Sequence, residues 1–547
     1  MRITRLLIGI LFIPCTLFSQ DWPKIFGTSS YTYLQGGLIE SYDKGYMMVC
    51  QVEPGPFVPQ MYSWIIKTDI NGNLLWTKTI FSPSYQISFN GFDQTPDGGF
   101  VLTGVTNKLD PGNYDVVFMK FNACGEKQWC NIVSTPGNDD YGVKIKSIPG
   151  GYISLVDYFQ DWITKRIWLF KLDNNGNILW ENLINVSDSL IQNAEGRDIL
   201  VTSTKDFIVT GDAYEGSPGH TYYLRPLIIK TDSNGNDQWT LPFGTSIGFL
   251  GELSKYPSEN QSGYIYTTAT HFRDSIPFGG PPCFLKISPN GQSAYYRDLI
   301  LDSIIINPGP ASIIGGAATL NLKNNDSLFI ASVWQDRNNV QTVGIMKSDT
   351  LGVVSKVKVL FQNVLYSTLE ESFISFDGKI VAAGDFNIPS STMNIYLYKF
   401  NTNLEFDSTY TVPRFYDSLC PYPIVSDTVS PDDCGIITAI HDPVMEPGFF
   451  KLKVYPNPAT TMITLEIPKY LTHRNQGNGL TTTTIYHQWN SANLEIYDLF
   501  GKIVYSSEIQ QTTEELKIDI SGWHKGMYVA RLVYMKELVA SEKFIVE

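Results

Sequence analysis

The sequence predicts an all-β fold, a seven-bladed β-propeller followed by a small Ig-like β-sandwich. Three observations lead to this prediction. Aromatic residues make up 13% of the 547 residues, with 31 Tyr and 30 Phe, and such residues favour strands. A strand-and-turn unit recurs seven times within residues 21–413. Residues 448–547 then carry a separate pattern of short strands.

Composition also limits the classes of function. Lys and Arg number 40 against 54 Asp and Glu, so the net charge is −14 and nucleic acid would be repelled. Apolar residues make up 43%, which suits packed cores and is too little for a membrane protein. We therefore expect a monomer without a nucleic-acid partner.

The first element, residues 1–20, is predicted to be a secretory signal peptide. Arg2 and Arg5 precede an apolar run, 6–18, that is too short to span a bilayer. Cys15 raises the alternative of a lipoprotein, but Pro14 stands where a lipidation signal has a small residue. This segment predicts export.

The second element, residues 21–413, consists of the seven repeats. The repeating unit has a glycine turn, a short apolar strand, a variable loop, an alternating strand ending in lysine, and a glycine turn followed by an aromatic residue. The last two copies depart from it, because Lys356 stands at the aromatic position of the sixth and the seventh lacks the second glycine. With one further strand, each copy has about four, as propeller blades do. The lysine, here called the repeat lysine, marks the copies at Lys67, Lys120, Lys171, Lys230, Lys286, Lys347 and Lys399.

The turn after the repeat lysine has its own chemistry. Asn-Gly, as at 71–72, supplies the positive φ angles of a tight hairpin, and Asp69 can cap it. The following Trp is expected to pack between neighbouring sheets, and Trp22–Gly27 to complete the last blade. An open β-solenoid is the alternative, although its repeats are usually much shorter. The units resemble the degenerate tandem β-propeller repeats of exported bacterial proteins, which identify a scaffold and no chemistry.

Six cysteines outside the signal peptide predict disulfides in an exported protein. Cys124 and Cys130 flank a turn and could face each other across a hairpin. Cys420 and Cys434 could close a small loop. The remaining two, which have no obvious partner, are Cys50 and Cys283.

The last element, residues 448–547, follows a Pro-, Asp- and Ser-rich segment at 414–447 that is predicted to be a linker. Seven short strands in about a hundred residues predict a small β-sandwich. The polar stretch 471–490 is expected to be a long loop.

Three signatures occur in order in this region: VYPNPA at 454–459, LEIYDLFGKIVYS at 494–506 and IDISGWHKGMYVARL at 518–532, before the final KFIVE. Together they resemble the C-terminal (type A) sorting domain of type IX secretion cargo from Bacteroidota. The motif residues are Tyr455, Pro456, Asn457, Pro458, Gly501, Gly526 and Tyr528. The resemblance implies passage through the periplasm, recognition by the type IX translocon, and a secreted or cell-surface location, where family members typically lose the domain. An ordinary Ig-like binding domain is the alternative.

No motif predicts a catalytic, cofactor or metal site. Residues 244–248 spell G-x-S-x-G, but no helical pattern follows to expose a nucleophilic Ser246. The DxNGN turns resemble calcium loops, yet their glycine comes fourth rather than sixth. We therefore expect no cofactor, no metal and no enzyme, although a carboxylate pair assembled from different blades stays open.

The predicted function is a surface or secreted binding or adhesion module with an unknown protein or glycan ligand. Long loops with aromatic residues at 54–63, 216–226 and 271–283 suit such contacts. An extracellular hydrolase or lyase acting on carbohydrate or peptide is the alternative, and a structural envelope component is a third.

Surface O-glycosylation is a further prediction, because Asp-Ser/Thr before an aliphatic or small residue is a modification pattern of exported Bacteroidota proteins. The pair is also a common turn sequence, which is the alternative explanation. The candidate positions are Ser189, Ser275, Ser303, Ser327, Thr350, Ser408, Ser418 and Thr428.

Overall fold

The computed structural model describes residues 22–438 and 452–547, except for 55–59, 135–138, 160–164, 185–190, 216–222, 244–254, 271–281, 300–318, 325, 336–340, 363–365, 388–391, 468–470, 478–479, 487–490, 499–501, 511, 514 and 535–536. The predicted signal peptide lies outside these residues. Every regular element in the described residues is a β-strand, as the sequence predicts. Among them there is no helix of the length and hydropathy needed to cross a membrane.

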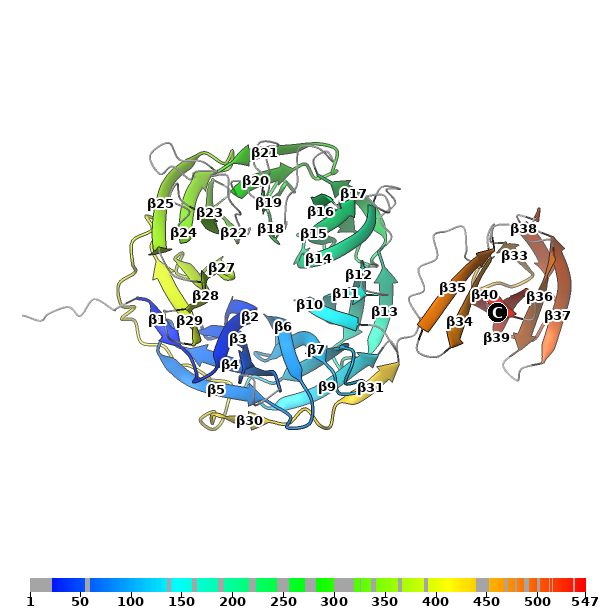
Figure 1. Ribbon diagram of the computed structural model, residues 1–547, viewed down its shortest axis with the longest axis horizontal. Coiled ribbons are helices and arrows are strands. Elements are labelled where there is room, and N and C mark those ends of the chain that lie inside the picture. The colour runs from blue at the N-terminus through cyan, green and yellow to red at the C-terminus, as the bar shows by residue number, and fades with distance from the viewer. Residues whose placement is uncertain are drawn as a thin grey trace, which may run out of the picture. The chain divides into compact units, whose positions relative to one another are not determined.

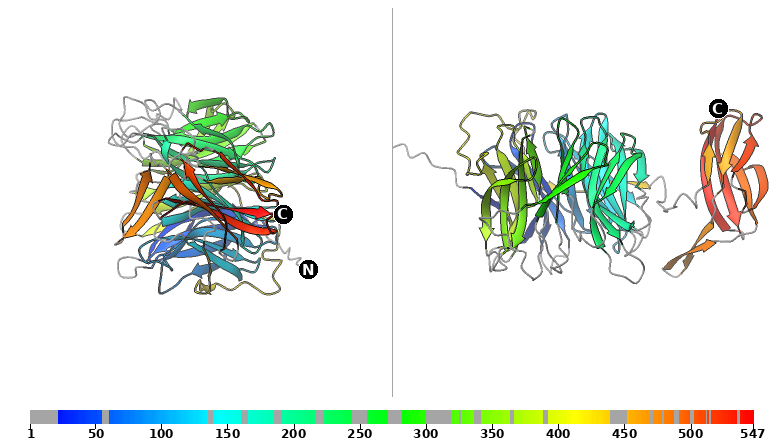
Figure 2. Two further views of the ribbon diagram at one scale, coloured as in Figure 1. Left: turned by 90° about the vertical axis from the view of Figure 1, so that its right-hand side faces the viewer. Right: turned by 90° about the horizontal axis from the view of Figure 1, so that it is seen from above.

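The described part of residues 24–400 forms seven antiparallel sheets, which stand around a ring as propeller blades (Figure 1). The first strand of a blade lies nearest the ring centre and the last lies at the rim. Seen from the side, the strands run between the two faces of the ring (Figure 2). The predicted all-β propeller is confirmed.

The strands of the blades follow one another along the chain. Blades one to three are β2 (Tyr31–Glu40), β3 (Tyr46–Glu53), β4 (Tyr62–Thr68) and β5 (Leu74–Ile80); β6 (Ile87–Gln94), β7 (Phe100–Thr106), β8 (Asp115–Phe121) and β9 (Lys127–Ser134); and β10 (Asp139–Ile148), β11 (Gly151–Phe159), β12 (Lys165–Asp173) and β13 (Ile178–Leu183). Blades four to six are β14 (Ile191–Val201), β15 (Phe207–Glu215), β16 (Tyr223–Thr231) and β17 (Asp237–Pro242); β18 (Lys255–Glu259), β19 (Ile265–Thr270), β20 (Pro282–Ile287) and β21 (Ala294–Asp298); and β22 (Leu320–Lys323), β23 (Ser327–Gln335), β24 (Gln341–Asp349) and β25 (Val354–Gln362). Blade seven is β26 (Tyr366–Ser367), β27 (Glu371–Ile374), β28 (Ile380–Asn387) and β29 (Met393–Phe400), completed by β1 (Lys24–Phe26).

The N-terminal strand closes the ring. Strand β1 pairs antiparallel with β29, so the first and last parts of the propeller share one sheet. Trp22 lies beside it, buried, and its indole Nε1 donates a hydrogen bond to the carbonyl of Asp407 at 3.2 Å. The predicted role of the N-terminal segment is confirmed.

The structure explains why the repeat lysine recurs. In blade one, Lys67 is buried and its Nζ lies 2.5 Å from Oδ1 of Asp43, in the turn between β2 and β3. Equivalent ion pairs form in three other blades: Lys120–Asp97, Lys230–Asp206 and Lys399–Asp377. The lysine thus joins the third strand of a blade to the turn between its first two strands.

The Asn-Gly turns hold neighbouring blades together. An ideal Cβ on Gly176, where φ is +80°, would lie 2.8 Å from the ring of Trp129 in the preceding blade. The same indole donates to the carbonyl of Asn174 at 3.0 Å. Because Trp packs flat on the next blade's turn, only glycine fits there.

Residues 414–438, here called the strap, are not the predicted linker. They run along the rim of the first two blades, where β30 (Asp427–Val429) adds in parallel to β5 and β31 (Gly435–Thr438) adds in parallel to β9 (Figure 1). The chain divides into two compact units at 440/441, so the strap belongs with the propeller. Its Pro-rich composition is typical of irregular backbone. Two short segments of it nevertheless form strands, because the outer edges of β5 and β9 have backbone groups free to pair with them.

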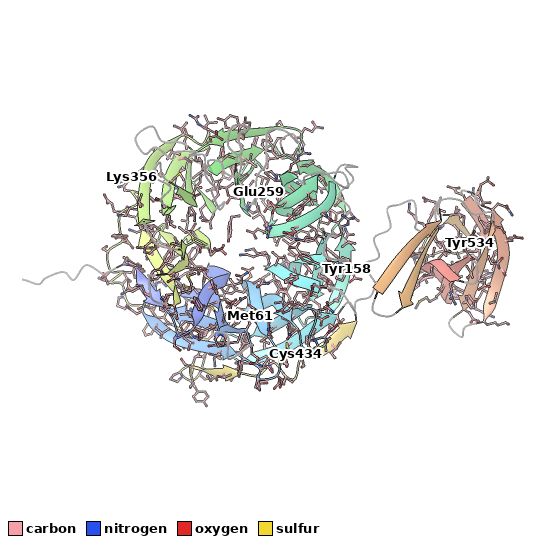
Figure 3. All side chains as sticks on the ribbon, viewed as in Figure 1. Met61, Tyr158, Glu259, Lys356, Cys434 and Tyr534 are labelled. Carbon is pink, nitrogen blue, oxygen red and sulfur yellow. A yellow bond between two sulfur atoms is a disulfide. The ribbon has the colours of Figure 1, made fainter. Side chains whose placement is uncertain are left out.

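The cysteine pairing also differs from the expectation. The disulfides join Cys124 to Cys420 and Cys130 to Cys434, so both tie the strap to blade two. Figure 3 shows Cys434 on the rim beside this blade. The local pairs were wrong because the strap returns to blade two from about 300 residues away, at separations of 296 and 304. The remaining Cys50 and Cys283 are free and buried.

The C-terminal unit is a β-sandwich, as predicted. One sheet contains β32 (Lys453–Tyr455), β33 (Met462–Glu466) and β38 (Glu515–Asp519). The other contains β37 (Ile503–Gln510), β36 (Ser491–Asp498), β39 (Gly526–Tyr534) and β40 (Glu537–Val546). The expected loop at 471–490 instead contains a hairpin, β34 (Leu471–Gly477) and β35 (Leu480–Tyr486). Its threonine-rich second strand has β propensity that outweighed the polar composition.

Candidate functional site

The loops that we expected to contact a ligand share one end of the propeller, here called the loop face. Each joins the second strand of a blade to the third, as β3 to β4 and β15 to β16. The tips at 55–59, 216–222 and 271–281 lie outside the described residues. The strands beneath them are described, and they position the side chains considered next.

Blades three and four build a charged cluster near the loop face. Arg197 on β14 donates from Nε to Asp212 at 2.9 Å and from Nη2 to Glu195 at 2.7 Å. Lys165 on β12 reaches across from blade three to the same Glu195. A bulge in β14 at 196–198 places Arg197 in this position, because a bulge redirects the side chain of the extra residue.

The cations of this cluster are more accessible than its carboxylates. The side chains of Arg197 and Lys165 are 32% and 26% exposed, whereas Glu195 is 7% exposed. A ligand arriving from solvent would therefore meet hydrogen-bond donors first, with acceptors directly behind them.

Aromatic rings border the same cluster. The Lys165 ammonium lies 4.8 Å from the ring centroid of Phe159 and 5.6 Å from that of Tyr214. Tyr141 packs against Phe159 at 5.0 Å between centroids, and Tyr114 against Tyr141 at 5.8 Å. Charged groups beside aromatic faces form a surface that can bind hydroxyls and C–H groups together.

Asp157 lies behind this surface and joins the two blades. Its Oδ1 accepts a hydrogen bond from the backbone N–H of Gly196 at 2.7 Å. Burial raises the pKa of Asp157 to about 8, and the hydrogen bond from Gly196 and the charge of Arg197 oppose that shift. Asp385 occupies the same place in blade seven and accepts from the N–H of Leu34 in blade one at 2.6 Å. The parallel identifies an inter-blade contact.

We expect this contact to make stability depend on pH. A folded-state pKa of about 8 against an ordinary 3.8 means that the stabilising protonated form is lost as pH rises through this interval. Wild-type protein should therefore lose unfolding free energy between these values, and Asp157→Asn should lose less. Urea unfolding at a series of pH values measures the difference. The exposed Asp326→Asn should keep the wild-type slope, and equal slopes for all three proteins would contradict the expectation.

Paired charges fill the ring centre. Lys144 of blade three lies 2.9 Å from Glu371 of blade seven, and Tyr256 of blade five donates to the carbonyl of Glu370. Burial alone lowers the pKa of Lys144, but the facing carboxylate raises it overall, so the amine stays charged. Gly37 leaves room for this pair, since its Cβ would lie 2.4 Å from Oε2 of Glu371. Because these groups satisfy one another, the ring centre is a structural junction.

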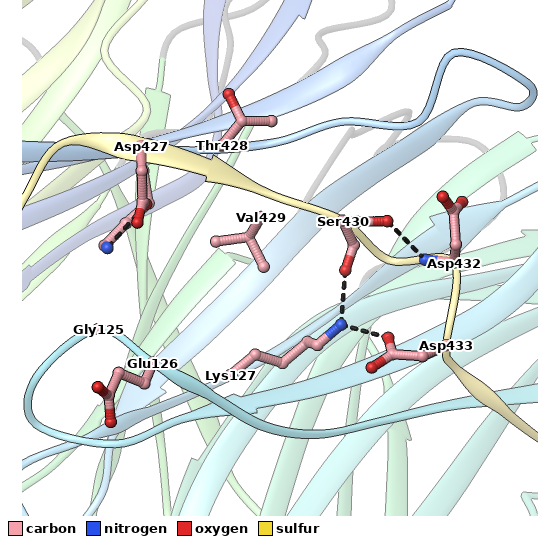
Figure 4. A pocket seen from close by; sticks show the side chains of 10 residues that line it. Gly125, Glu126, Lys127, Asp427, Thr428, Val429, Ser430, Asp432 and Asp433 are labelled. Carbon is pink, nitrogen blue, oxygen red and sulfur yellow. Dashed lines mark hydrogen bonds and ion pairs between the residues drawn. The ribbon is translucent and has the colours of Figure 1, made fainter.

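A pocket of about 540 Å³ lies between the strap and the turn of blade two (Figure 4). Lys127 lines it and donates to the carbonyl of Ser430 at 2.5 Å and to Asp433. Lys78 binds Asp427 on the same wall at 2.7 Å. These contacts fix the strap to blades one and two, so we assign the residues of the pocket a structural role.

The DxNGN turns satisfy their own carboxylates. Asp69 accepts from the backbone N–H groups of Asn71 and Asn73, each at 2.8 Å, and from the Asn73 amide. Asp capping of the turn is thereby confirmed. No group of three or more metal-ligating side chains suited to an ion occurs among the described residues. The G-x-S-x-G stretch lies outside them.

Three of the sorting-domain motif residues, Asn457, Gly526 and Tyr528, lie against the last strand, β40. The Asn457 amide donates to the carbonyl of Lys543 at 3.2 Å and accepts from the N–H of Ile545 at 2.9 Å. Gly526 and Tyr528 on β39 lie opposite β40 in register. Tyr455 is the last residue of β32, Pro456 and Pro458 flank Asn457 in the segment that follows, and Gly501 lies outside the described residues.

The candidate glycosylation positions differ in accessibility. Ser408, Ser418 and Thr428 are exposed, and Ser327 and Thr350 are half-buried. Ser189, Ser275 and Ser303 lie outside the described residues. The aspartates before the exposed three have structural roles, such as Asp427 with Lys78 and Asp417 with Trp76. Glycosylation stays a prediction: protein from its own host should carry hexose-scale mass increments by intact-mass measurement, and a mass equal to the polypeptide would leave only the structural role.

The structure thus consists of a propeller and a small β-sandwich in two compact units. Residues 453–547 match the family described as "Secretion system C-terminal sorting domain". The chain is therefore a type IX secretion cargo, exported to the cell surface or the extracellular space. No curated protein matches the chain.

Solved structures resemble the chain in fold. An ulvan lyase is 11% identical with a TM-score of 0.45, covering 69% of this chain and 96% of that one. The polysaccharide lyase Uly1 is 8% identical with a TM-score of 0.43, covering 70% of this chain and 100% of that one. An α-L-arabinanase of Penicillium chrysogenum is 10% identical with a TM-score of 0.35, covering 68% of this chain and 96% of that one. The expectation that the protein is not an enzyme is contradicted by these comparisons and is not retained, because catalytic proteins are among the similar structures.

Sequence reasoning missed the cluster of blades three and four. A signal was present, since an aspartate recurs late in the second strand of three blades, at Asp157, Asp212 and Asp385. The partners of these aspartates lie on other strands, and linear spacing does not predict such contacts.

Proposed function

We propose that the propeller binds an extracellular, uncharged glycan on the loop face of blades three and four. The observation that carries this proposal is the network in which Arg197 joins Glu195 and Asp212, with Lys165 beside it. It places donors and acceptors next to one another beside the rings of Phe159 and Tyr214. Sugar hydroxyls need both donor and acceptor partners, and sugar C–H faces stack on aromatic rings.

Charge favours an uncharged ligand. Two cations face two carboxylates in the cluster, and Asp157, with its pKa of about 8, is mostly protonated at neutral pH. The local charge is thus close to zero, while the whole chain carries −14. A polyanionic ligand would gain little at the site and would be repelled by the rest of the molecule.

A glycan array followed by calorimetry on the best ligand tests the proposal. We expect Arg197→Ala to weaken binding by at least ~10-fold, because the arginine that joins Glu195 and Asp212 at the centre of the cluster is removed. Arg297→Ala on the exposed outer strand β21 is the matched control and should bind as wild type. Unchanged affinity of Arg197→Ala, or binding to proteins alone on a mixed array, would contradict the proposal.

A second candidate is hydrolysis of the bound glycan at the same cluster. The favouring observation is that Asp157, whose raised pKa keeps a proton, lies near Glu195, which is paired with cations. Two carboxyl groups in such different environments suit acid and base roles. The test is release of reducing ends from the array ligand. Asp157→Asn should abolish turnover at unchanged affinity, and binding without turnover by wild type would leave the first candidate alone.

A further inference from the structure

The outer face of the four-stranded sheet in the C-terminal sandwich carries an apolar row. Strand register places Ile503 opposite Tyr497, and Tyr497 opposite Val529. Beside them Met527 lies opposite Ile545. These side chains come from β37, β36, β39 and β40. The residue of β40 opposite Val529 is the exposed Lys543, so the apolar row reaches β40 through the pair of Met527 and Ile545.

These five side chains do not belong to the core. Alternation along each strand sends Ile496, Tyr528 and Phe544 inward, where they are buried. Their neighbours point outward, and Ile503, Met527 and Ile545 remain 46%, 40% and 45% exposed. A solvent-facing side of an antiparallel sheet is normally polar, so a contiguous apolar row on it indicates a contact surface.

The opposite face of the sandwich differs in character. The outward positions of β38 are Glu515, Lys517 and Asp519, all exposed and charged. Lys453 and Glu466 form an exposed ion pair at 3.0 Å on the neighbouring strands. Met462, opposite Asp519, is also exposed on this face, so here an apolar side chain stands among charged neighbours, whereas the apolar row groups five of them.

The apolar row is assembled from the motif segments of the domain. Tyr497 and Ile503 belong to LEIYDLFGKIVYS, Met527 and Val529 to the Gly-x-Tyr segment, and Ile545 to the terminal KFIVE. The inward side chains of each motif are needed to form the core. The outward side chains are not in the core, so packing of the domain does not explain why they are apolar. Residues 453–547 match a secretion sorting domain, whose partner is a protein of the secretion machinery.

We propose that this apolar row is the surface through which the secretion machinery binds the sorting domain. The partner is a machinery protein with an apolar patch that covers Met527 and Ile545. The polar border of the row, where Arg531 lies 5.3 Å from the ring centroid of Tyr497, would fix the orientation. The proposal is independent of the propeller's ligand and rests on the sorting assignment.

The test uses the full chain in its own host and measures the exported against the periplasmic fraction. Met527→Glu and Ile545→Glu should each lower export at least ~10-fold, because a charge is placed in an apolar contact. Met462→Glu is the matched control, since Met462 is 49% exposed on the outer face of the other sheet. It should be exported as wild type.

A photo-crosslinking amino acid at position 527 or 462 gives a second measurement that does not depend on the stability of the glutamate variants. Adducts with a secretion-machinery protein should form from 527 and not from 462. Wild-type export of both apolar-row variants, an equal defect in Met462→Glu, or equal crosslinking from both positions would overturn the proposal. Export after deletion of the whole domain would instead refute the sorting assignment.

Discussion

Replacing Lys67 by Met should destabilise the propeller by about 3–5 kcal/mol, since removing one partner of a buried ion pair leaves the other charge buried and unpaired. Both side chains of the Lys67–Asp43 pair are 1% exposed. Asp43 also accepts from Gly45 N–H at 3.1 Å and, through Oδ2, from the N–H of Asp417 in the strap at 3.0 Å. The variant therefore disturbs a turn and the strap together.

Denaturant unfolding followed by tryptophan fluorescence measures this effect. The double variant Lys67→Met with Asp43→Asn should recover part of the loss, because no buried charge is left unpaired. Lys44→Met is the control, since the Lys44 side chain is 37% exposed in its pair with the half-buried Glu40, and it should cost clearly less stability than Lys67→Met. A Lys67→Met protein as stable as the control would show that the repeat lysine is not an anchor of the blade.

Deleting residues 452–547 should stop export altogether and leave folded propeller in the periplasm. The match to the sorting domain provides the reason for the loss of export. The structure provides the reason for continued folding: the sandwich core draws only on residues from Leu452 to Val546, and the propeller cores draw on none of them. Both disulfides and both strap strands also lie before residue 440.

Cell fractionation with detection of the propeller measures the result. As a complementary experiment, residues 452–547 fused to a foreign exported reporter should carry it to the cell surface in a host with the translocon. Propeller found outside cells without the domain, or a reporter that stays periplasmic, would contradict the sorting role.

The sequence by itself determined the repeating parts of this protein. Lys67, Lys120, Lys230 and Lys399, the Asn-Gly turns and the Trp residues make contacts within a blade or with the next one, and those contacts recur along the chain. The VYPNPA and Gly-x-Tyr motifs likewise indicated the sorting domain, and the structure places Asn457, Gly526 and Tyr528 of these motifs against the last strand, β40.

The tertiary structure alone decided the features that join distant segments. The strap read as a linker because nothing in its composition shows that β5 and β9 leave edges for β30 and β31 to pair with. The disulfides were predicted between cysteines that are close in sequence. The strap instead brings Cys420 and Cys434 back to blade two, where they bond to Cys124 and Cys130. The cluster of Lys165, Glu195, Arg197 and Asp212 arises where two blades meet and a bulge redirects one side chain. Such contacts depend on how strands pack around the ring, which spacing along the chain does not encode.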